Sequence, residues 1–239
     1  MTQSRRQILR AVGAGGLTVL GGVAGAQDTT TVEGEAARVR VLHAIPDAPA
    51  VDVFVDGDRV LEGVEFKDVS DYLELEPGQY TFAVAPAGEG RQGAILEQQA
   101  TLEPNTAYTV AAGGRLDGPE VFLFVDDTET PSGDQARLRA VHLSPDAPAV
   151  DIAADGDVLV EGLEFGNASE YLDVPAGSYT LEIRPAGADQ AVGTFDVTLD
   201  GGVVASAFAV GLVEAAEQAQ SLDLVTTVDA GGQEMTTTT

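Results

Sequence analysis

The chain has 239 residues, with 39 acidic side chains against 12 Lys and Arg and a formal net charge of −27. So large an excess of negative charge repels nucleic acid and anionic lipid, which excludes both as expected partners. Cysteine is absent, which excludes a disulfide framework and lipid attachment at a cysteine. The hydrophobic share of 44% is clearly patterned, which argues against a disordered chain. The acidity is typical of a high-salt environment, where counter-ions screen self-repulsion.

The first 26 residues resemble a twin-arginine export signal. Ser-Arg-Arg at residues 4–6 is followed by Ile-Leu-Arg at 8–10 and by a Gly- and Ala-rich apolar run. That run is shorter and richer in glycine than the ~20 strongly apolar residues of a membrane-spanning helix. Small residues at 24–26 supply a cleavage site, so we expect an exported chain that begins near Gln27 and has no membrane span. A transit peptide and an uncleaved anchor are the alternatives.

After a segment expected to be disordered (27–36), one sixteen-residue pattern occurs twice. It reads HAIPDAPAVDVFVDGD from His43 and HLSPDAPAVDIAADGD from His142, and the offset of 99 residues holds without a gap through Gly88 and Gly187. The chain is therefore a tandem duplication, with repeats at 37–127 and 137–228. The stretch 128–136 is rich in Pro, Ser, Gly and Asp and predicts a linker. Residues 229–239 are expected to be a disordered tail.

Each repeat reads as short strands. In ARVRVLH, Val39 and Val41 alternate with Arg38 and Arg40, which predicts a half-buried strand. Asp56-Gly57 between apolar runs predicts a hairpin. About seven such strands, with turns every eight to twelve residues, favour two tandem immunoglobulin-like antiparallel β-sandwich domains joined end to end by a short linker.

Two Leu-x-Pro…Tyr passages in the first repeat are typical of tyrosine corners, in which a phenol tethers a crossover loop to backbone. They end at Tyr80 and Tyr108. The second repeat keeps Tyr179 but has Ala205 where the counterpart of Tyr108 would fall. These passages predict sandwich architecture and carry no information about function.

The motifs HxxPDAPxVDVxVDG and YxxLxPGxYTxxVxPAG, in tandem, resemble the domain of unknown function numbered 4397. The resemblance spans both repeats. It implies a β-domain of exported bacterial and archaeal surface proteins, and it brings no catalytic residues with it.

The repeated stretch offers nitrogen and oxygen ligands, and the metal candidates are His43, Asp47, His142 and Asp146. Spacing argues against one shared site, because Asp52 and Asp56 lie roughly 13 Å apart along a strand. A structural corner explains the stretch more simply: Asp47 caps an Asx turn, Asp56 opens the hairpin, and the histidine hydrogen-bonds across the loop. We therefore expect no metal and no cofactor. The residues with an expected structural role are Pro46, Asp47, Pro49, Asp52, Asp56, Gly57, Tyr80, Tyr108, Pro145, Asp146, Pro148, Asp151, Asp155, Gly156 and Tyr179.

No catalytic residue is predicted. Nucleophilic catalysis needs Ser or Cys beside His and an acid, and Ser144 beside His142 is replaced by Ile45 in the first repeat. The leading interpretation is a non-enzymatic secreted or cell-envelope module for adhesion, assembly or surface structure, with envelope proteins or surface polymers as partners. The alternative is a secreted ligand- or metal-binding protein, or a hydrolase, that uses the His43 and His142 loops. A third interpretation is a subunit of a larger envelope complex.

Overall fold

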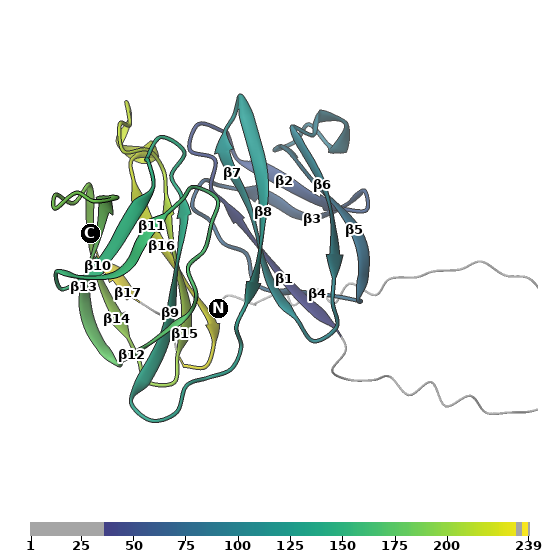
Figure 1. Cartoon of the computed structure of the whole chain (residues 1–239). Helices are drawn as coiled ribbons and strands as arrows, with labels where there is room; N and C mark the ends of the chain where they lie inside the picture. The colour runs from purple at the N-terminus through teal and green to yellow at the C-terminus, as the bar shows by residue number, and fades with distance from the viewer. Residues whose placement is uncertain (1–35, 233–235, 239) are drawn as a thin grey trace, which may run out of the picture. The chain divides into compact units, whose positions relative to one another are not determined.

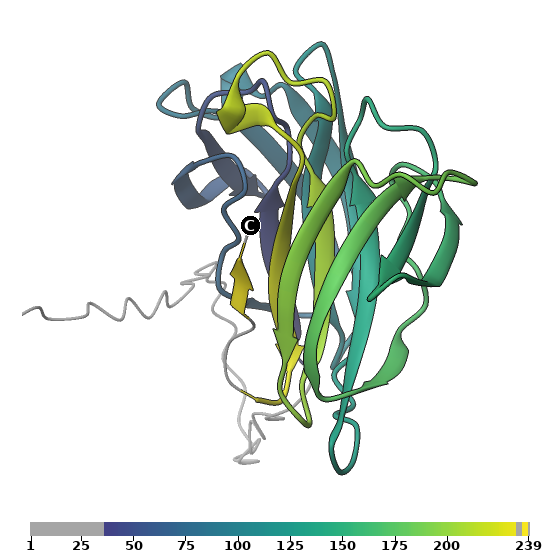
Figure 2. The same cartoon turned by 90° about the vertical axis from the view of Figure 1, so that its left-hand side faces the viewer.

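The computed structural model describes residues 36–232 and 236–238, and these residues belong to one compact unit. The predicted export signal and nearly all of the segment 27–36 lie outside the described residues. Each repeat folds into a pair of facing β-sheets (Figures 1 and 2). The all-β prediction of two tandem sandwich domains is confirmed.

The first repeat has eight strands and one short 3-10 helix, η1. They are β1 (Ala37–His43), β2 (Val51–Val55), β3 (Asp58–Val64), β4 (Leu73–Leu75), β5 (Gly78–Pro86), η1 (Arg91–Gly93), β6 (Leu96–Leu102), β7 (Ala107–Arg115) and β8 (Gly118–Asp126).

The second repeat follows the same plan and adds a final strand. Its elements are β9 (Gln135–Leu143), β10 (Val150–Ala154), β11 (Asp157–Leu163), β12 (Leu172–Pro175), β13 (Gly177–Pro185), β14 (Gly193–Leu199), β15 (Val204–Val210), η2 (Gln218–Gln220), β16 (Asp223–Ala230) and β17 (Thr236–Thr238).

The strand order is the same in both repeats. One sheet has the order β4-β1-β7-β8 or β12-β9-β15-β16, and the other has β3-β2-β5-β6 or β11-β10-β13-β14-β17. The pairs β1–β7 and β9–β15 are parallel and all other pairs are antiparallel, so one sheet of each sandwich is mixed. The first strand of each repeat inserts between β4 and β7, or between β12 and β15, which makes it central rather than an edge.

Each sandwich closes its own apolar layer. In the first repeat, Val39, Val41 and Val110 of the mixed sheet face Phe82 and Val84 of the other sheet. In the second, Leu138 and Ala207 pack against Leu181 and Phe195 in the same way. Removing these side chains from water drives each half to close.

The two repeats also share an apolar layer, so the expectation of sandwiches placed end to end is wrong. Leu42, Ala44, Ala111 and Phe124 of the first repeat pack in one buried cluster with four residues of the second, which are Val141, Leu143, Phe208 and Val210. The central strands β1, β7, β9 and β15 are consequently covered on both faces, by their own sandwich on one and by the other repeat on the other. We call this shared layer the seam.

Two expectations about irregular segments also need correction. β9 begins at Gln135, inside the segment expected to be linker, and β16 runs to Ala230. The tail expected to be disordered contains β17, which pairs antiparallel with β14. Threonine favours the extended backbone, and the edge of β14 offers unpaired N–H and C=O groups.

Within the described residues, no helix has the length and apolar character needed to cross a membrane.

Candidate functional site

Each repeated stretch begins with a histidine that is 0% exposed. Nε2 of His43 lies 3.2 Å from the carbonyl oxygen of Pro49, and its Nδ1 accepts the backbone N–H of Ile45 at 3.3 Å. Because Nδ1 accepts, the neutral ring carries its proton on Nε2 and donates it to the proline carbonyl. The second repeat has the same pair of contacts, from His142 to Pro148 (3.0 Å) and from Ser144 (3.3 Å). Both ring nitrogens are engaged in holding the loop.

The same burial sets the protonation of these rings. Desolvation, the largest cause, lowers the pKa of His43 and His142 below the ordinary 6.5, against the opposing hydrogen bonds to Pro49 and Pro148. The histidines are therefore neutral at pH 7, and Phe66 and Phe165 stand edge-on to them.

Asp47 and Asp146 lie in the same loops but tether distant backbone. Asp47 accepts the N–H of Leu116, at the β7–β8 turn, at 2.8 Å. Asp146 accepts the N–H groups of Val213 (2.9 Å) and Glu214 (3.0 Å). Both carboxylates thus reach backbone that is distant in the chain, a contact that the expected Asx turn at Asp47 does not include, and Asp146 also accepts the hydroxyl of Ser144 in its own loop at 3.3 Å. Pro46, Pro49, Pro145 and Pro148 flank these tethers in the loops that follow β1 and β9.

Asp52 and Asp151 connect their strands to two glycine turns each. Asp52 is 0% exposed and accepts the N–H groups of Gly63 (2.9 Å) and Gly88 (3.2 Å). Burial disfavours its charge, but these bonds and the Arg59 guanidinium outweigh burial and lower its pKa. Asp151 accepts the equivalent N–H groups of Gly187 (2.9 Å) and Gly162 (2.7 Å). These bonds lower the pKa of Asp151 as well.

The Asp-Gly pairs form the predicted hairpins. Asp56 and Gly57 both have positive φ (50° and 95°), as a type I′ turn requires, and so do Asp155 and Gly156. Each aspartate also accepts a cross-strand N–H, from Thr81 at 2.8 Å or from Thr180 at 2.9 Å.

The predicted tyrosine tethers are present in this geometry. The hydroxyls of Tyr80 and Tyr179 donate to carbonyl oxygens four residues earlier, at 2.9 and 2.6 Å. Tyr108 accepts the N–H of Glu103 at 3.0 Å. The repeated stretch and these tyrosines therefore serve loop anchoring.

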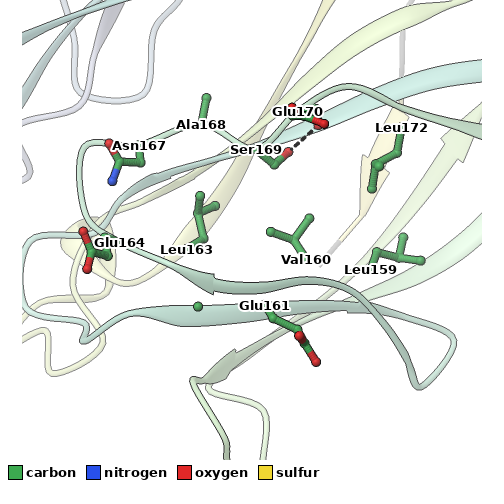
Figure 3. A pocket seen from close by; sticks show the side chains of 11 residues that line it. Leu159, Val160, Glu161, Leu163, Glu164, Asn167, Ala168, Ser169, Glu170 and Leu172 are labelled. Atoms are coloured by element: carbon green, nitrogen blue, oxygen red, sulfur yellow. Dashed lines mark hydrogen bonds between the residues drawn. The ribbon is translucent and has the colours of Figure 1, made fainter.

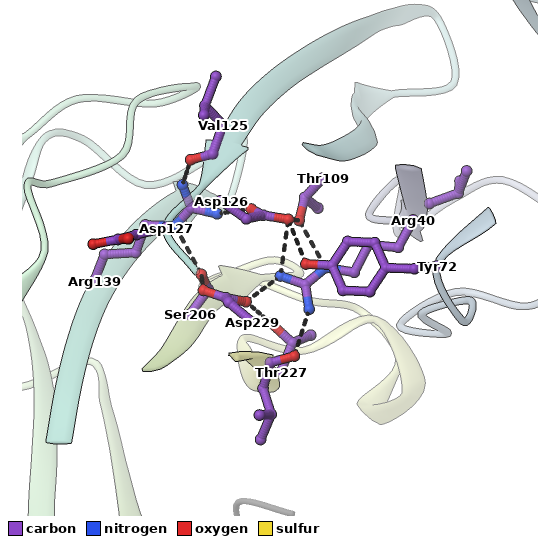
Figure 4. Close-up of polar contacts among 12 residues, drawn as sticks. Arg40, Tyr72, Thr109, Val125, Asp126, Asp127, Arg139, Ser206, Thr227 and Asp229 are labelled. Atoms are coloured by element: carbon purple, nitrogen blue, oxygen red, sulfur yellow. Dashed lines mark hydrogen bonds and ion pairs between the residues drawn. The ribbon is translucent and has the colours of Figure 1, made fainter. Parts of the chain in front are cut away.

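A second constellation lies at the seam, and sequence reasoning missed it. Arg40, 3% exposed, donates through Nε to Thr109 (2.7 Å) in its own repeat. Its two other nitrogens cross to the second repeat, where they bind the carbonyl oxygen of Val228 (3.1 Å) and the carboxylate of Asp229 (Figure 4).

Arg139 makes the reciprocal contacts. It donates to Ser206 (2.7 Å) within its repeat and crosses to the carbonyl oxygen of Val125 (2.7 Å) and the carboxylate of Asp126. Each arginine thus ends on the other repeat's aspartate, which is the contact pattern of a twofold-symmetric interface within one chain.

Two tyrosines complete the network. Tyr72 donates to Asp126 at 2.7 Å, and Tyr171 donates to Asp229 at 2.6 Å. The guanidinium carbons of Arg40 and Arg139 lie 4.9 and 4.8 Å from the respective ring centres, within cation–π range. Burial, followed by the neighbouring carboxylates, raises the pKa of both phenols. They are therefore permanent donors at neutral pH.

The two arginines and two aspartates cancel in charge, and every described buried side-chain N or O atom has a hydrogen-bond partner. Burial disfavours the charge of Arg40, but Asp126 and Asp229 outweigh that cost and raise its pKa. The network is therefore fully paired, and its chemistry is directed inward, to hold the repeats together.

An open pocket with a volume of about 490 Å³ lies in the second repeat (Figure 3). Leu159, Val160, Leu163 and Leu172 supply apolar walls. Glu161, Glu164 and Glu170 add acidic groups, and no basic residue lines it. Over the described chain, no group of three or more His, Cys, Asp or Glu is placed to hold a metal ion.

A family model described as "Domain of unknown function (DUF4397)" matches residues 37–153 and again residues 141–237. The chain belongs to the DUF4397 family. The first match covers the first sandwich and continues into β10, and the second match covers most of the second sandwich. The two matches confirm the tandem resemblance read from the motifs. No curated protein matches the chain.

Among solved structures, the Bacillus anthracis TIE protein is similar over 73% of this chain, at 11% sequence identity and a TM-score of 0.24. The chain spans about a third (33%) of the length of that protein.

The seam of this DUF4397 pair left one signal in the sequence. Arg40 and Arg139 are identical across the 99-residue offset, and so are Tyr72 and Tyr171. The alternation of apolar and polar residues in β1 nevertheless predicted that Arg40 faces solvent, because a pattern within one strand carries no information about a second sandwich that covers that face. The aspartates lie at an offset of 103 residues, beyond the gap-free match, so pairing Asp126 with Asp229 needed the structure.

We predict that Arg40→Met lowers the free energy of unfolding by about 3–5 kcal/mol, because it leaves Asp229 buried without its guanidinium. Arg139→Met should cost a similar amount, since it strips Asp126 in the same way. Chemical denaturation of the full chain measures both. The control is Arg91→Met, whose ion pair with Glu97 is 42% and 51% exposed and contributes about 0–1 kcal/mol. An Arg40→Met cost no greater than the control's would contradict the assignment.

The lowered histidine pKa values predict a loss of stability in mild acid. Below pH 6.5 the unfolded chain takes up protons at His43 and His142 while the folded chain does not, so the free energy of unfolding falls with pH until the folded pKa values are reached. Denaturation at a series of pH values from 7.5 to about 5, above the range in which the aspartates titrate, measures the slope. In the double variant His43→Gln/His142→Gln the slope should flatten; an unchanged slope would assign it to other groups.

Proposed function

We propose that the chain is a non-enzymatic module of the extracellular space or cell envelope, serving adhesion, assembly or surface structure. The observation that carries this proposal is the use of the repeated side chains. His43, Asp47 and Asp52, with their counterparts in the second repeat, spend their polar atoms on loop and backbone contacts. A site for catalysis keeps reactive groups directed at an open cavity, and these groups are directed at the protein itself.

Charge and family membership support the same proposal. The motifs resemble a family of exported surface proteins, and the chain belongs to that family by its two matches. The acidic surface suits high salt and favours envelope proteins or surface polymers over nucleic acid as partners.

Location is the first test. Protease added to intact cells in high salt should degrade the protein while a cytoplasmic marker survives, as followed by immunoblot. Arg5→Lys/Arg6→Lys should retain the chain inside, because the paired arginines are the expected export determinant. Arg10→Lys, outside the pair, is the matched control and should behave as the native chain. Protection of the native chain on intact cells would contradict a surface location.

The alternative of a ligand- or metal-binding protein draws support from the pocket beside β11 rather than from the histidine loops. Its apolar walls and acidic groups suit a cationic amphiphile.

Metal analysis of protein purified without chelator tests whether the His43 and His142 loops bind metal or only anchor the structure. We expect substoichiometric metal, unchanged in His43→Ala and His142→Ala, together with reduced thermal stability of both variants. About one metal per repeat, lost with the histidines, would overturn the structural role.

A further inference from the structure

The second repeat has an extra strand on its outer edge. β17 pairs antiparallel with β14, placing Thr236 opposite Thr198, Thr237 opposite Val197 and Thr238 opposite Asp196 (Figure 1). The chain's own C-terminal segment thus closes that edge of the sandwich.

The equivalent edge of the first repeat is open. β6 is the counterpart of β14, and within the described strands it ends its sheet. A groove of about 300 Å³ runs where the counterpart of β17 would lie, between β6 and β8. Its lining consists of Phe82, Gln98, Gln99, Ala100, Val110, Val121 and Leu123. Leu123 is 40% exposed there, an unusual position for a large apolar side chain.

The backbone of β6 directs hydrogen-bonding groups outward at this edge. Thr81 of β5 accepts the N–H of Asp56, so its backbone faces away from β6. Gln99, which stands opposite Thr81, therefore directs its own N–H and C=O outward. The carbonyl oxygen of Gln99 accepts a hydrogen bond from the side chain of Gln98 at 3.0 Å, an exposed contact that an incoming strand would replace. In the second repeat Thr180 accepts from Asp155 in the same way, and its partner Asp196 is the residue that pairs with β17. Gln99 and Thr101 are thus the counterparts of Asp196 and Thr198.

The composition of β6 leaves the edge unprotected. Residues 98–102 read QQATL, with no charge and no proline, although such residues are the usual protection against strand addition. The opposite edge strand of the same sheet, β3, carries Asp58, Arg59 and Glu62. β6 has one charged residue, Glu97 near its start, which pairs with Arg91. In so acidic a chain, the uncharged stretch 98–102 beside the groove is a local exception.

We propose that the β6 edge binds an extended strand from a different protein, by antiparallel addition in the register that β17 adopts on β14. The occupant is a neutral or basic segment with β-branched residues, one of which faces the groove, because the surrounding surface repels acidic chains. Another copy's tail is the less favoured donor, since only five residues connect Ala230 to Thr236 and the resulting effective concentration retains β17 in its own chain. This inference rests on the proposed assembly role and gives it a place and a partner chemistry.

The absence of cysteine allows a sharp test by disulfide trapping. The probe is the peptide Gln-Glu-Met-Cys-Thr-Thr-Thr, which copies residues 233–239 with cysteine in place of Thr236. In the full chain carrying Thr101→Cys, the residue expected opposite that cysteine, the adduct should form about tenfold faster or more than in Asp157→Cys, an exposed position on β11. Mass spectrometry of the intact protein measures both rates.

Adding Gln99→Pro to Thr101→Cys should abolish the advantage, because it removes the outward N–H without touching the bonds to β5. Leu123→Glu, at an exposed site, should reduce it by charging the groove, and Gln99→Asn should leave it intact. Thermal melts confirm that each variant folds. Equal rates at Thr101→Cys and Asp157→Cys, or an advantage that survives Gln99→Pro, would overturn strand addition.

The identity of the donor is tested by light scattering of the native chain. A monomer at all concentrations supports a foreign strand. Concentration-dependent oligomers that vanish when residues 235–239 are deleted would make a second copy the donor and overturn the proposed occupant. None of these outcomes bears on whether the protein reaches the cell surface, so failure here is distinguishable from failure of the proposed function.

Discussion

Two arginines that exchange partners across the seam are the constraint on which the rest of the structure depends. Arg40 and Arg139 each carry a full charge where almost no water reaches, and each binds the other repeat's aspartate; Arg40 also lies 3.5 Å from the carboxylate of Asp126 in its own repeat. Apolar packing alone brings surfaces together with little preference for register, whereas a buried ion pair tolerates no slip. The network therefore determines how β1 and β7 face β9 and β15, and the apolar residues of the seam bury hydrophobic surface around the network.

The repeated histidine stretch supports the position of the two arginines. It lies at the ends of the central strands, where the chain leaves the mixed sheet and crosses to the other. Its prolines, buried histidine and aspartate tethers hold that crossing at a constant shape, so that Arg40 and Arg139 start from equivalent positions. These contacts agree with the structural corner expected from the sequence: the stretch is duplicated because each repeat anchors the same crossing loop.

Local patterns predicted much of the sandwich, and they failed where a second layer intervened. The Asp-Gly hairpins at 56–57 and 155–156 and the tethers of Tyr80 and Tyr179 follow from interactions a few residues long, so the sequence carries them openly. Arg40 and the partners of Asp47 depend on residues far away in the chain, and alternation along one strand holds no information about them. The strand at 236–238 was missed for a similar reason, since an uncharged threonine run becomes a strand only where an edge is free to pair.

The seam residues differ in size between the two repeats. Ala44 of the first repeat corresponds to Leu143 of the second and Ala111 to Phe208, whereas Phe124 corresponds to the smaller Thr227, so at these positions each repeat is small where the other is bulky. Two copies of the same repeat would therefore leave a void at some of these positions and clash at others. The two repeats are therefore no longer interchangeable. Each is shaped to pack against the other repeat rather than against a copy of itself.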